Sequence, residues 1–547
     1  MPKLDIKKIT WDFFKQKKSY VIYYLFLILS YPLKDVACSK YYGELLELVI
    51  NRKDLTGTVI KTLSLLVTSM IGMSTLTKLD SKTIPQFRSH LYREISKYIF
   101  EIHKEDYTNI KIGELVSKLS KIPYLILELF YQIRSSYLPT VYLLFFCTLY
   151  FFSFNSALGI LVLGVVFSYF IITLSLKRSC MPSCVSAETS GDSTNENLQD
   201  ILENILSVYS SNSIEDEIKA MDAKNNNLQE NMSNCLNCAS KYKSYFSTMY
   251  IASFSLLCGF IYSLYKAEKI TLAQTTTALV ISVHLLSNID WCVQYMADTI
   301  SYIGSIIDIQ NYIDGLNERY ENNTYHINKL NRNLYTGELD TIKGKVTFKD
   351  IHLCFGQNCI LRNFNYTIEP KEKIAIVGNI GSGKSSLLKM ILKLTYPTKG
   401  QILIDDKNLP YDKTRNYVSY IGQSPILFNR TLYDNIVYGT NKTRDDVVSL
   451  MKTYGLERVF GNRTLDDNVG KGGNLLSGGQ KQIVIILRSV LRDTPVVLLD
   501  EPTTALDNKN KELILDTIFK IFEDKTMIMV THDQEAMKRF NHFIKLN

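Results

Sequence analysis

The sequence lacks clusters of basic residues on one face. Its Lys and Arg residues mostly flank apolar blocks, and the net charge of the 547 residues is only +8. Because a nucleic-acid-binding protein gathers its basic residues into a patch or stripe, we expect no nucleic-acid partner. No small-residue cleavage site follows the first apolar stretch. This predicts that the stretch is retained as a helix and not removed as a signal peptide.

The ten cysteines do not have the spacing of a disulfide framework. Two local pairs, Cys180 with Cys184 and Cys235 with Cys238, have the spacing of one helix face, and four thiols together would suit zinc. Counted from a turn near Ile214, however, the pairs are offset along the helix axes by roughly 13 Å, too far for one tetrahedral site. We therefore expect isolated thiols that serve only packing.

Apolar residues are concentrated in blocks before residue 310, and about 20 such residues are needed to cross the hydrocarbon core of a membrane. Six stretches qualify: Tyr20–Cys38, Thr58–Leu79, Tyr137–Phe154, Ala157–Leu176, Tyr245–Tyr265 and Leu272–Cys292. The basic N-terminus and the basic stretch at residues 88–104 predict the cytoplasmic side. An even number of spans returns the chain to that side. We therefore expect an integral multi-pass membrane protein with both termini in the cytoplasm, or in the matrix if the membrane is organellar.

The segments between the spans predict long helices beyond the membrane. About 57 residues separate spans two and three, and about 68 separate spans four and five. Both segments have helical periodicity and few helix breakers, which favours two long helical hairpins over a loop domain with its own core. Residues 315–336 are polar and lack an apolar period, as linkers do. The predicted domains are a membrane domain at 1–314, this linker, and a soluble domain at 337–547.

A glycine-rich segment at residues 378–385 follows the apolar run 374–377 and precedes a helix-like stretch. Strand, loop and helix in this order are the context of a phosphate-binding loop, which makes a chance match a weak alternative. Backbone N–H groups and the helix N-terminus would bind phosphates, Lys384 would reach the β- and γ-phosphates, and Ser385 would bind Mg²⁺. The predicted ATP contacts in this segment are Gly378, Asn379, Gly381, Ser382, Gly383, Lys384, Ser385 and Ser386.

Two acids end the apolar run 496–499. A buried strand would hold Asp500 beside Mg²⁺, and Glu501 would polarise the attacking water. A purely structural core strand explains the apolar residues but not the two acids.

The segment Leu476-Ser477-Gly478-Gly479-Gln480 matches the signature sequence of ATP-binding cassette (ABC) proteins. Further family elements follow in order: Gln423 resembles the Q-loop glutamine, Asp507 the D-loop aspartate and His532 the switch histidine. Phe355 stands where the family usually has an aromatic residue that stacks on adenine. Its alternation with Ile351 and Leu353 also fits a core residue at a strand end.

The resemblance covers nearly the whole chain. Residues 87–94 and 113–119 resemble the first intracellular loop of type IV exporters, the group of multidrug and mitochondrial half-transporters. Residues 469–473 resemble the exporter X-loop, although Lys471 stands where the family usually has Glu. Ile483 replaces the polar residue that is common just after the signature.

The resemblance implies a fold class: a polytopic α-helical membrane domain with six long transmembrane helices, followed by an α/β P-loop nucleotide-binding domain. It also implies ATP and Mg²⁺ as cofactors, with Gln423 as a further Mg²⁺ ligand. In the family the signature of one cassette faces the phosphate loop of another. A second half-transporter, expected to be a second copy of this chain, is therefore the implied partner. Turns near Ile99–Tyr107 and Ser211–Asp216 would be the coupling helices.

The expected function is export driven by ATP hydrolysis. An ATP-gated channel or a non-transporting regulator on the same frame is the alternative, and intact Lys384, Asp500, Glu501 and His532 argue against it. An importer half would usually keep its cassette on a separate chain. The cargo, whether a small molecule, a lipid or a peptide, is left open. Asp290 in the sixth span is the candidate cavity residue, because a charge at membrane depth is costly unless it has a function. A solvated position near the interface is the other reading.

Overall fold

The computed structural model describes residues 4–102, 112–330, 334–335, 342–355, 358–379, 381–503 and 508–546. The chain forms two compact units. The helical unit comprises Met1–Glu101 and Ile110–Glu318, and the cassette unit comprises Ile102–Asn109 and Arg319–Asn547. Residues 103–111, which include most of the turn predicted near Ile99–Tyr107, lie outside the described part of the chain.

In the described part of the chain, six helical stretches are long and apolar enough to cross a membrane: Lys18–Ile50, Thr56–Ile102, Ser117–Phe154, Ser156–Glu203, Ile214–Lys266 and Leu272–Gln294. Each contains most or all of one predicted span, so the prediction of six spans is confirmed. The helices of this unit are α1 (Ile6–Gln16), α2 (Lys18–Ile28), α3 (Ser30–Pro32), η1 (Leu33–Ala37), α4 (Cys38–Ile50), α5 (Thr56–Ile102), α6 (Ile112–Gln132), η2 (Ile133–Tyr137), α7 (Leu138–Phe154), α8 (Ser156–Glu203), α9 (Ile205–Ser210), α10 (Ile214–Lys266), α11 (Leu272–Gln294) and α12 (Met296–Leu330).

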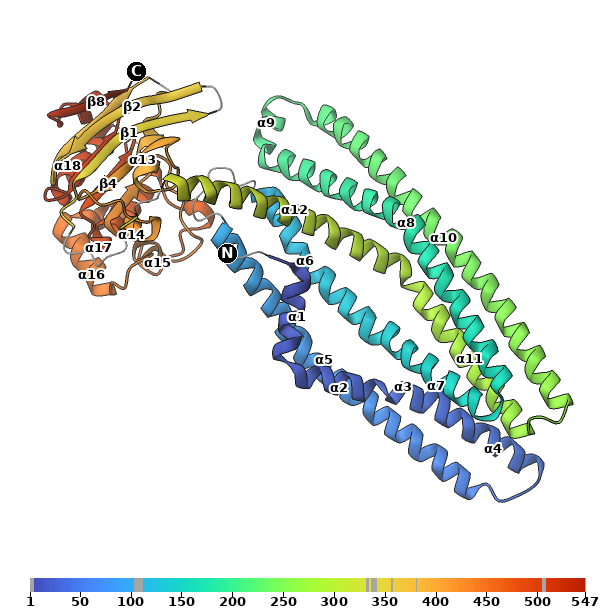
Figure 1. Cartoon of the computed structure of the whole chain (residues 1–547). Coiled ribbons are helices and arrows are strands. Elements are labelled where there is room, and N and C mark those ends of the chain that lie inside the picture. The colour runs from blue at the N-terminus through green and yellow to red at the C-terminus, as the bar shows by residue number, and fades with distance from the viewer. Residues whose placement is uncertain are drawn as a thin grey trace. The chain divides into compact units, whose positions relative to one another are not determined.

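Helices α8 and α10 form a hairpin of two long continuous helices that lie side by side (Figure 1). They contain 48 and 53 residues, more than twice the length that a membrane requires. Aromatic stacking of Tyr169 on Phe246, with ring centroids 5.9 Å apart, joins them in the apolar part. Helix α12 continues to Leu330, inside the range 315–336 that the sequence analysis assigns to the linker.

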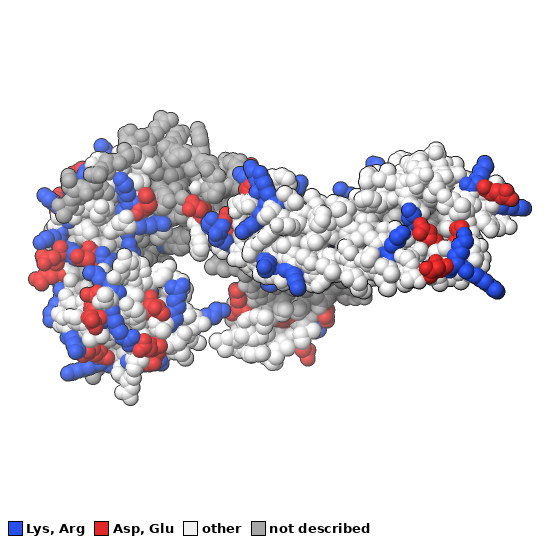
Figure 2. Space-filling view, turned by 90° about the horizontal axis from the view of Figure 1, so that it is seen from below, with Lys and Arg blue, Asp and Glu red and all other residues white. Residues whose placement is uncertain are grey.

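The surface of the helical unit fits a lipid environment. In this unit, at the right of Figure 2, charged side chains gather near the tip, and an extended area without charge lies beside them. Large apolar side chains on α8 point outward; Ile160, for example, is 63% exposed and Phe167 is 62% exposed. Such exposure would be unfavourable in water and is expected where lipid covers the helix.

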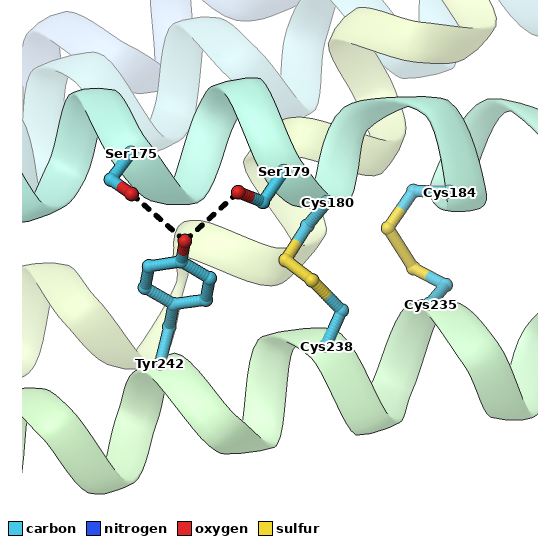
Figure 3. The surroundings of a disulfide bond; sticks show 7 residues. All are labelled: Ser175, Ser179, Cys180, Cys184, Cys235, Cys238 and Tyr242. Carbon is cyan, nitrogen blue, oxygen red and sulfur yellow. Dashed lines mark hydrogen bonds between the residues drawn. A yellow bond between two sulfur atoms is a disulfide. The ribbon is translucent and has the colours of Figure 1, made fainter.

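The prediction that the cysteines of α8 and α10 are isolated thiols is wrong. The structure joins Cys180 to Cys238 and Cys184 to Cys235 in two disulfides across the hairpin (Figure 3). The error lies in the position of the turn, because α9 belongs to the turn and does not continue α8. The hairpin is therefore centred near residue 210 and not near Ile214, and the offset between the cysteine pairs disappears. A third disulfide joins Cys354 to Cys359 in the cassette unit.

The cassette unit contains two sheets. A three-stranded antiparallel sheet has the order β2-β1-β4, and a five-stranded parallel sheet has the order β5-β6-β7-β3-β8. The strands are β1 (Val346–Phe355), β2 (Asn358–Ile368), β3 (Lys373–Gly378), β4 (Lys399–Ile404), β5 (Val418–Ile421), β6 (Val496–Asp500), β7 (Thr526–Val530) and β8 (His542–Leu546). All five residues of β6 and all five of β7 are buried, as expected for a parallel sheet covered on both faces.

Helices surround the parallel sheet. They are α13 (Lys384–Ile391), α14 (Tyr411–Tyr417), α15 (Leu432–Ile436), α16 (Arg444–Tyr454), η3 (Leu456–Phe460), η4 (Lys471–Gly473), α17 (Gly478–Arg492), α18 (Asn508–Ile521) and α19 (Gln534–Met537). Together with the six spans, this α/β unit confirms the predicted fold class. Ile483 on α17 is fully buried in the core of the unit, so the replacement of a polar residue there serves packing.

The cassette unit has a buried lysine outside the glycine-rich loop. Lys393, just after α13, is 6% exposed and donates a hydrogen bond from Nζ to Asn408 Oδ1 at 2.7 Å. Burial disfavours the charged ammonium and lowers the pKa of Lys393 from 10.5 to about 8. Between these two pH values the unfolded chain binds more protons than the folded chain, so folding becomes more favourable as the pH rises.

We predict that the unfolding free energy of the wild-type chain, relative to that of Lys393→Met, increases by about 2 kcal/mol between pH 7 and pH 9.5. Interactions of the side chain that do not depend on its protonation are lost equally at both pH values and cancel. Thermal unfolding of both proteins at the two pH values measures this difference. A difference that does not change with pH would mean that Lys393 keeps its proton throughout.

Candidate nucleotide-binding site

The predicted catalytic residues meet at one edge of the parallel sheet. The glycine-rich loop follows β3, and the other groups stand at or just beyond the ends of β5, β6 and β7: Gln423, Asp500, Glu501 and His532. Since all these strands run in the same direction, their carboxyl ends lie at the same edge. Ligands of open α/β sheets bind at this edge.

The glycine-rich loop has the conformation that a phosphate cradle requires. Gly381 and Gly383 have φ values of 83° and 90°, in the left-handed region that favours glycine. A Cβ atom on Gly383 would lie 2.7 Å from Ile360 Cγ2, so a side chain there would clash. Between them, the Ser382 hydroxyl is buried and has no hydrogen-bond partner among the described residues. A buried hydroxyl without a partner fits a loop that receives phosphate oxygens.

Lys384 opens α13 and is 7% exposed. Its Nζ donates to the carbonyl oxygens of Gly378 and Asn379 at 3.0 and 2.7 Å. The loop carbonyls thus hold the ammonium group against the loop at the helix N-terminus. Both the point charge and the helix dipole favour an anion there, as predicted for the β- and γ-phosphates of ATP.

Ser385 and Asp500 form the pair of groups that would hold Mg²⁺. Ser385 Oγ donates to Asp500 Oδ1 at 3.0 Å, and the Tyr420 hydroxyl donates to Asp500 Oδ2 at 3.0 Å. Mg²⁺ usually keeps several waters and takes only one or two protein groups plus phosphate oxygens, so this pair suffices. In the described ranges, no group of three or more His, Cys, Asp or Glu residues is arranged around a metal position. Tyr420 belongs to no sequence motif, so no local pattern pointed to this contact.

Glu501 lies between Gln423 and His532. Gln423 Nε2 donates to Glu501 Oε2 at 2.9 Å, and His532 Nε2 lies 3.7 Å from Glu501 Oε1. The Gln423 amide therefore contacts Glu501 here, and its role as a Mg²⁺ ligand stays a prediction. Glu501 has a positive φ of 46°, and its N–H donates to Val530 O at 2.9 Å. A strained backbone held by the sheet is typical of functional positions and aims this carboxylate.

The signature segment begins α17. Ser477 is the N-cap, and its hydroxyl accepts from Gln480 N while Gln480 Oε1 accepts from Ser477 N, a complete capping box. Gln480 Nε2 also donates to Val459 O at 2.9 Å. The helix N-terminus, with the N–H groups of Gly478 and Gly479, is fixed in a form that suits an anion.

Two predicted residues cannot be placed in the site. Asp507 and the side chain of Phe355 lie outside the described parts of the chain. The Phe355 backbone ends β1 and pairs with Asn358, and the Cys354–Cys359 disulfide crosses the same hairpin beside it. Ile351 and Leu353 are buried, which agrees with the alternation along β1. Both readings of Phe355 therefore stay predictions.

The sixth span contacts an acid that is not among the predicted site residues. Asp290 is half-buried, and Gln294 Nε2 lies 3.5 Å from its Oδ2. Asn288, two residues closer to the helix start, donates from Nδ2 to the His284 carbonyl oxygen at 2.9 Å. Asp35 is 8% exposed, and His284 Nδ1 lies 3.9 Å from its Oδ1. An acid within the apolar run Tyr20–Cys38 is the signal that points to it.

The cassette unit is similar in sequence to known proteins. Residues 361–504 match the family model described as ABC transporter. The ATP-dependent lipid A-core flippase of Francisella novicida is 32% identical over 219 residues, which are 38% of this chain and 37% of that protein. The glutathione/L-cysteine transport system ATP-binding/permease protein CydC of Escherichia coli (strain K12) is 32% identical over 208 residues, 37% and 36% of the two chains. The match thus spans little more than a third of these relatives.

Comparison with solved structures extends over both units. A bacterial Atm1-family ABC exporter with ATP bound matches 97% of this chain and 93% of its own with a TM-score of 0.83, at 18% sequence identity. The identity is low, so this likeness concerns the fold. It includes the six long helices as well as the cassette.

We predict that Phe355 contributes a flat aromatic face to adenine. Base–aromatic stacking is worth about 1–3 kcal/mol, so Phe355→Ala should weaken ATP binding by roughly 5- to 150-fold. Phe355→Tyr should leave the affinity nearly unchanged. ATP binding and thermal unfolding are to be measured on the same preparation. A destabilised alanine variant with unaltered affinity would show instead that Phe355 is a core residue of the strand.

Proposed function

We propose that the chain, whose residues 361–504 match the ABC transporter family model and whose fold is that of an ABC exporter, is a half-transporter that exports a cargo by hydrolysing ATP. The observation that carries the proposal is the position of Glu501 between Gln423 and His532, next to the Ser385–Asp500 pair. A sensor or channel needs to bind ATP but does not need a carboxylate held beside the metal groups. These catalytic groups are joined by one chain to six potential spans.

In this proposal each polar group of the site has one task. The loop N–H groups and Lys384 hold the phosphates, and Ser385 and Asp500 hold Mg²⁺, which neutralises charge on the phosphates when bound. Glu501 accepts a proton from the attacking water, and His532, 3.7 Å away, orients that carboxylate. The Tyr420 hydroxyl keeps Asp500 in place through its 3.0 Å bond.

We propose further that two copies of the chain work together. The Ser477 hydroxyl is engaged within its own capping box, while the first N–H groups of α17 remain available to an anion. A phosphate held by Lys384 of one chain and by α17 of the other would join two cassettes, and hydrolysis would release them. Long helices such as α8 and α10 would carry this movement to the spans, and Asp290 remains our candidate for contact with the cargo.

We predict that Glu501→Gln binds ATP but hydrolyses it at least about 100-fold more slowly, because general base catalysis is lost while the phosphate contacts stay. The measurement is ATPase activity and ATP binding of the protein reconstituted in lipid, across a panel of small molecules, lipids and peptides. Glu523→Gln is the matched control, since this exposed acid precedes β7 at the edge of the sheet opposite the site and should not alter turnover. Normal turnover in Glu501→Gln would remove Glu501 from its role.

We also predict that Ser477 of one chain completes the site that holds Lys384 of another. In a chain cleared of its own cysteines, Ser385→Cys combined with Ser477→Cys should cross-link between chains when ATP is added. Ser385→Cys with Ser449→Cys, which places a thiol on the exposed face of α16, is the matched control and should not cross-link. Cross-links formed only within one chain would contradict the paired arrangement.

Mixing two inactive variants gives a second test of the pairing. Lys384→Ala and Ser477→Arg chains place both defects in one of the two composite sites of a mixed dimer and leave the other intact. ATPase activity above that of either variant alone is expected.

A further inference from the structure

The two cysteine pairs of the α8–α10 hairpin mark the point where its packed part ends. Cys180 and Cys184 are each 1% exposed, and Cys235 is the first buried side chain of α10. Between Ile214 and Asn234 no side chain of α10 is buried, and this stretch is described throughout. The part of the hairpin beyond the cysteines therefore has little apolar packing of its own to hold the two helices together.

On both sides of the cysteines, polar side chains of α8 and α10 contact each other. Toward the apolar part, the Tyr242 hydroxyl lies 2.9 Å from both Ser175 Oγ and Ser179 Oγ (Figure 3). Toward the turn, Asn231 Nδ2 donates to Ser190 Oγ at 2.7 Å. Farther out, Lys224 donates to Asn197 at 3.0 Å. Polar contacts of this kind, half-buried or exposed, contribute little to stability, so the cysteines are the outermost strong connection.

We propose that Cys180–Cys238 and Cys184–Cys235 are a reversible thiol–disulfide site that fixes the outer hairpin to the packed part when oxidised. This inference is independent of the proposed export function. The basic loops predict that the hairpin faces the cytoplasm, where stable disulfides are rare and those that form are usually transient and redox-sensing. Each of the two cysteines on α8 faces one on α10, so the hairpin supplies two pairs of thiols, which are the groups that such a site requires.

The oxidant is a low-molecular-weight disulfide such as glutathione disulfide. Cys238 is half-buried and is the most accessible of the four thiols. Its thiolate attacks one sulfur of the glutathione disulfide, forming a mixed disulfide and releasing one glutathione thiolate. The Cys180 thiolate then displaces the second glutathione. Two cysteine protons pass to the two glutathione thiolates, and the glutathione disulfide accepts two electrons and becomes two molecules of glutathione.

The same stoichiometry holds for Cys184 and Cys235. Because Cys184 is 1% exposed and Cys235 is 8% exposed, this pair should react more slowly. Each closed disulfide restricts a loop that includes α9 and the turn, with sequence separations of 58 and 51 residues. The restriction lowers the conformational entropy that the outer hairpin gains when its two helices separate.

The test uses the full chain in lipid nanodiscs, equilibrated in glutathione buffers from fully reduced to fully oxidised. Free thiols are then blocked and the cross-linked peptides identified by mass spectrometry. We expect the peptides of Cys180 with Cys238 and of Cys184 with Cys235, the first appearing sooner, and both reversed by reduced glutathione. Amide hydrogen exchange of residues 214–234 should slow by about tenfold or more in the oxidised protein.

Two variants distinguish oxidation of these four cysteines from oxidation of cysteines elsewhere in the chain. Cys258→Ala removes a free cysteine of the same helix and should leave both cross-links and the change in exchange intact. Cys238→Ala should remove the first cross-link and keep Cys184–Cys235. The inference is overturned if the four thiols stay reduced in oxidised buffer, or if exchange of residues 214–234 does not respond to their oxidation. It is equally overturned if the reduced protein is isolated with zinc bound to these thiols.

Discussion

In the parallel sheet, Val530 of β7 pairs on one side with Asp500 of β6 and on the other with Ile376 of β3. The phosphate loop, Glu501 and His532 begin one or two residues beyond these three positions. A slip of one residue in either pairing would turn the acids to the other face of the sheet, so the chemistry depends on this register. The register is held because both faces of β6 and β7 are buried. The core strands thus position the site, although none of their apolar side chains takes part in it.

A second constraint shapes the helical unit. In lipid every backbone polar group must be paired within its segment, which favours long uninterrupted helices. Polar contacts between spans are then few and specific. Arg134 lies 2.6 Å from Asp80, which also accepts from the Tyr24 hydroxyl at 2.8 Å. Removing one partner of a buried ion pair leaves a buried charge without compensation. We infer that this group fixes α2, α5 and η2 to one another.

Most of the architecture could be predicted from the sequence because it depends on local signals. Apolar blocks of membrane length indicate the six spans, and a glycine-rich loop between strand and helix indicates the phosphate site. Contacts that depend on the exact register of two helices, or on segments distant in sequence, could not be predicted. An error of about five residues in the turn of the α8–α10 hairpin separated cysteines that in fact pair. Tyr420 at Asp500 and His284 at Asp35 are likewise contacts between segments distant in sequence, which no local pattern encodes.

The capping box at Ser477 has a consequence for assembly. Because the capping box already fixes the backbone at the start of the signature helix, two cassettes of the proposed dimer would meet as preformed surfaces, and little conformational entropy would be lost on contact. Membrane spans also confine both chains to two dimensions and orient their cassettes in the same direction. Such confinement acts as a high effective concentration. A weak cassette–cassette interface is then sufficient, and it can open again after each cycle of hydrolysis.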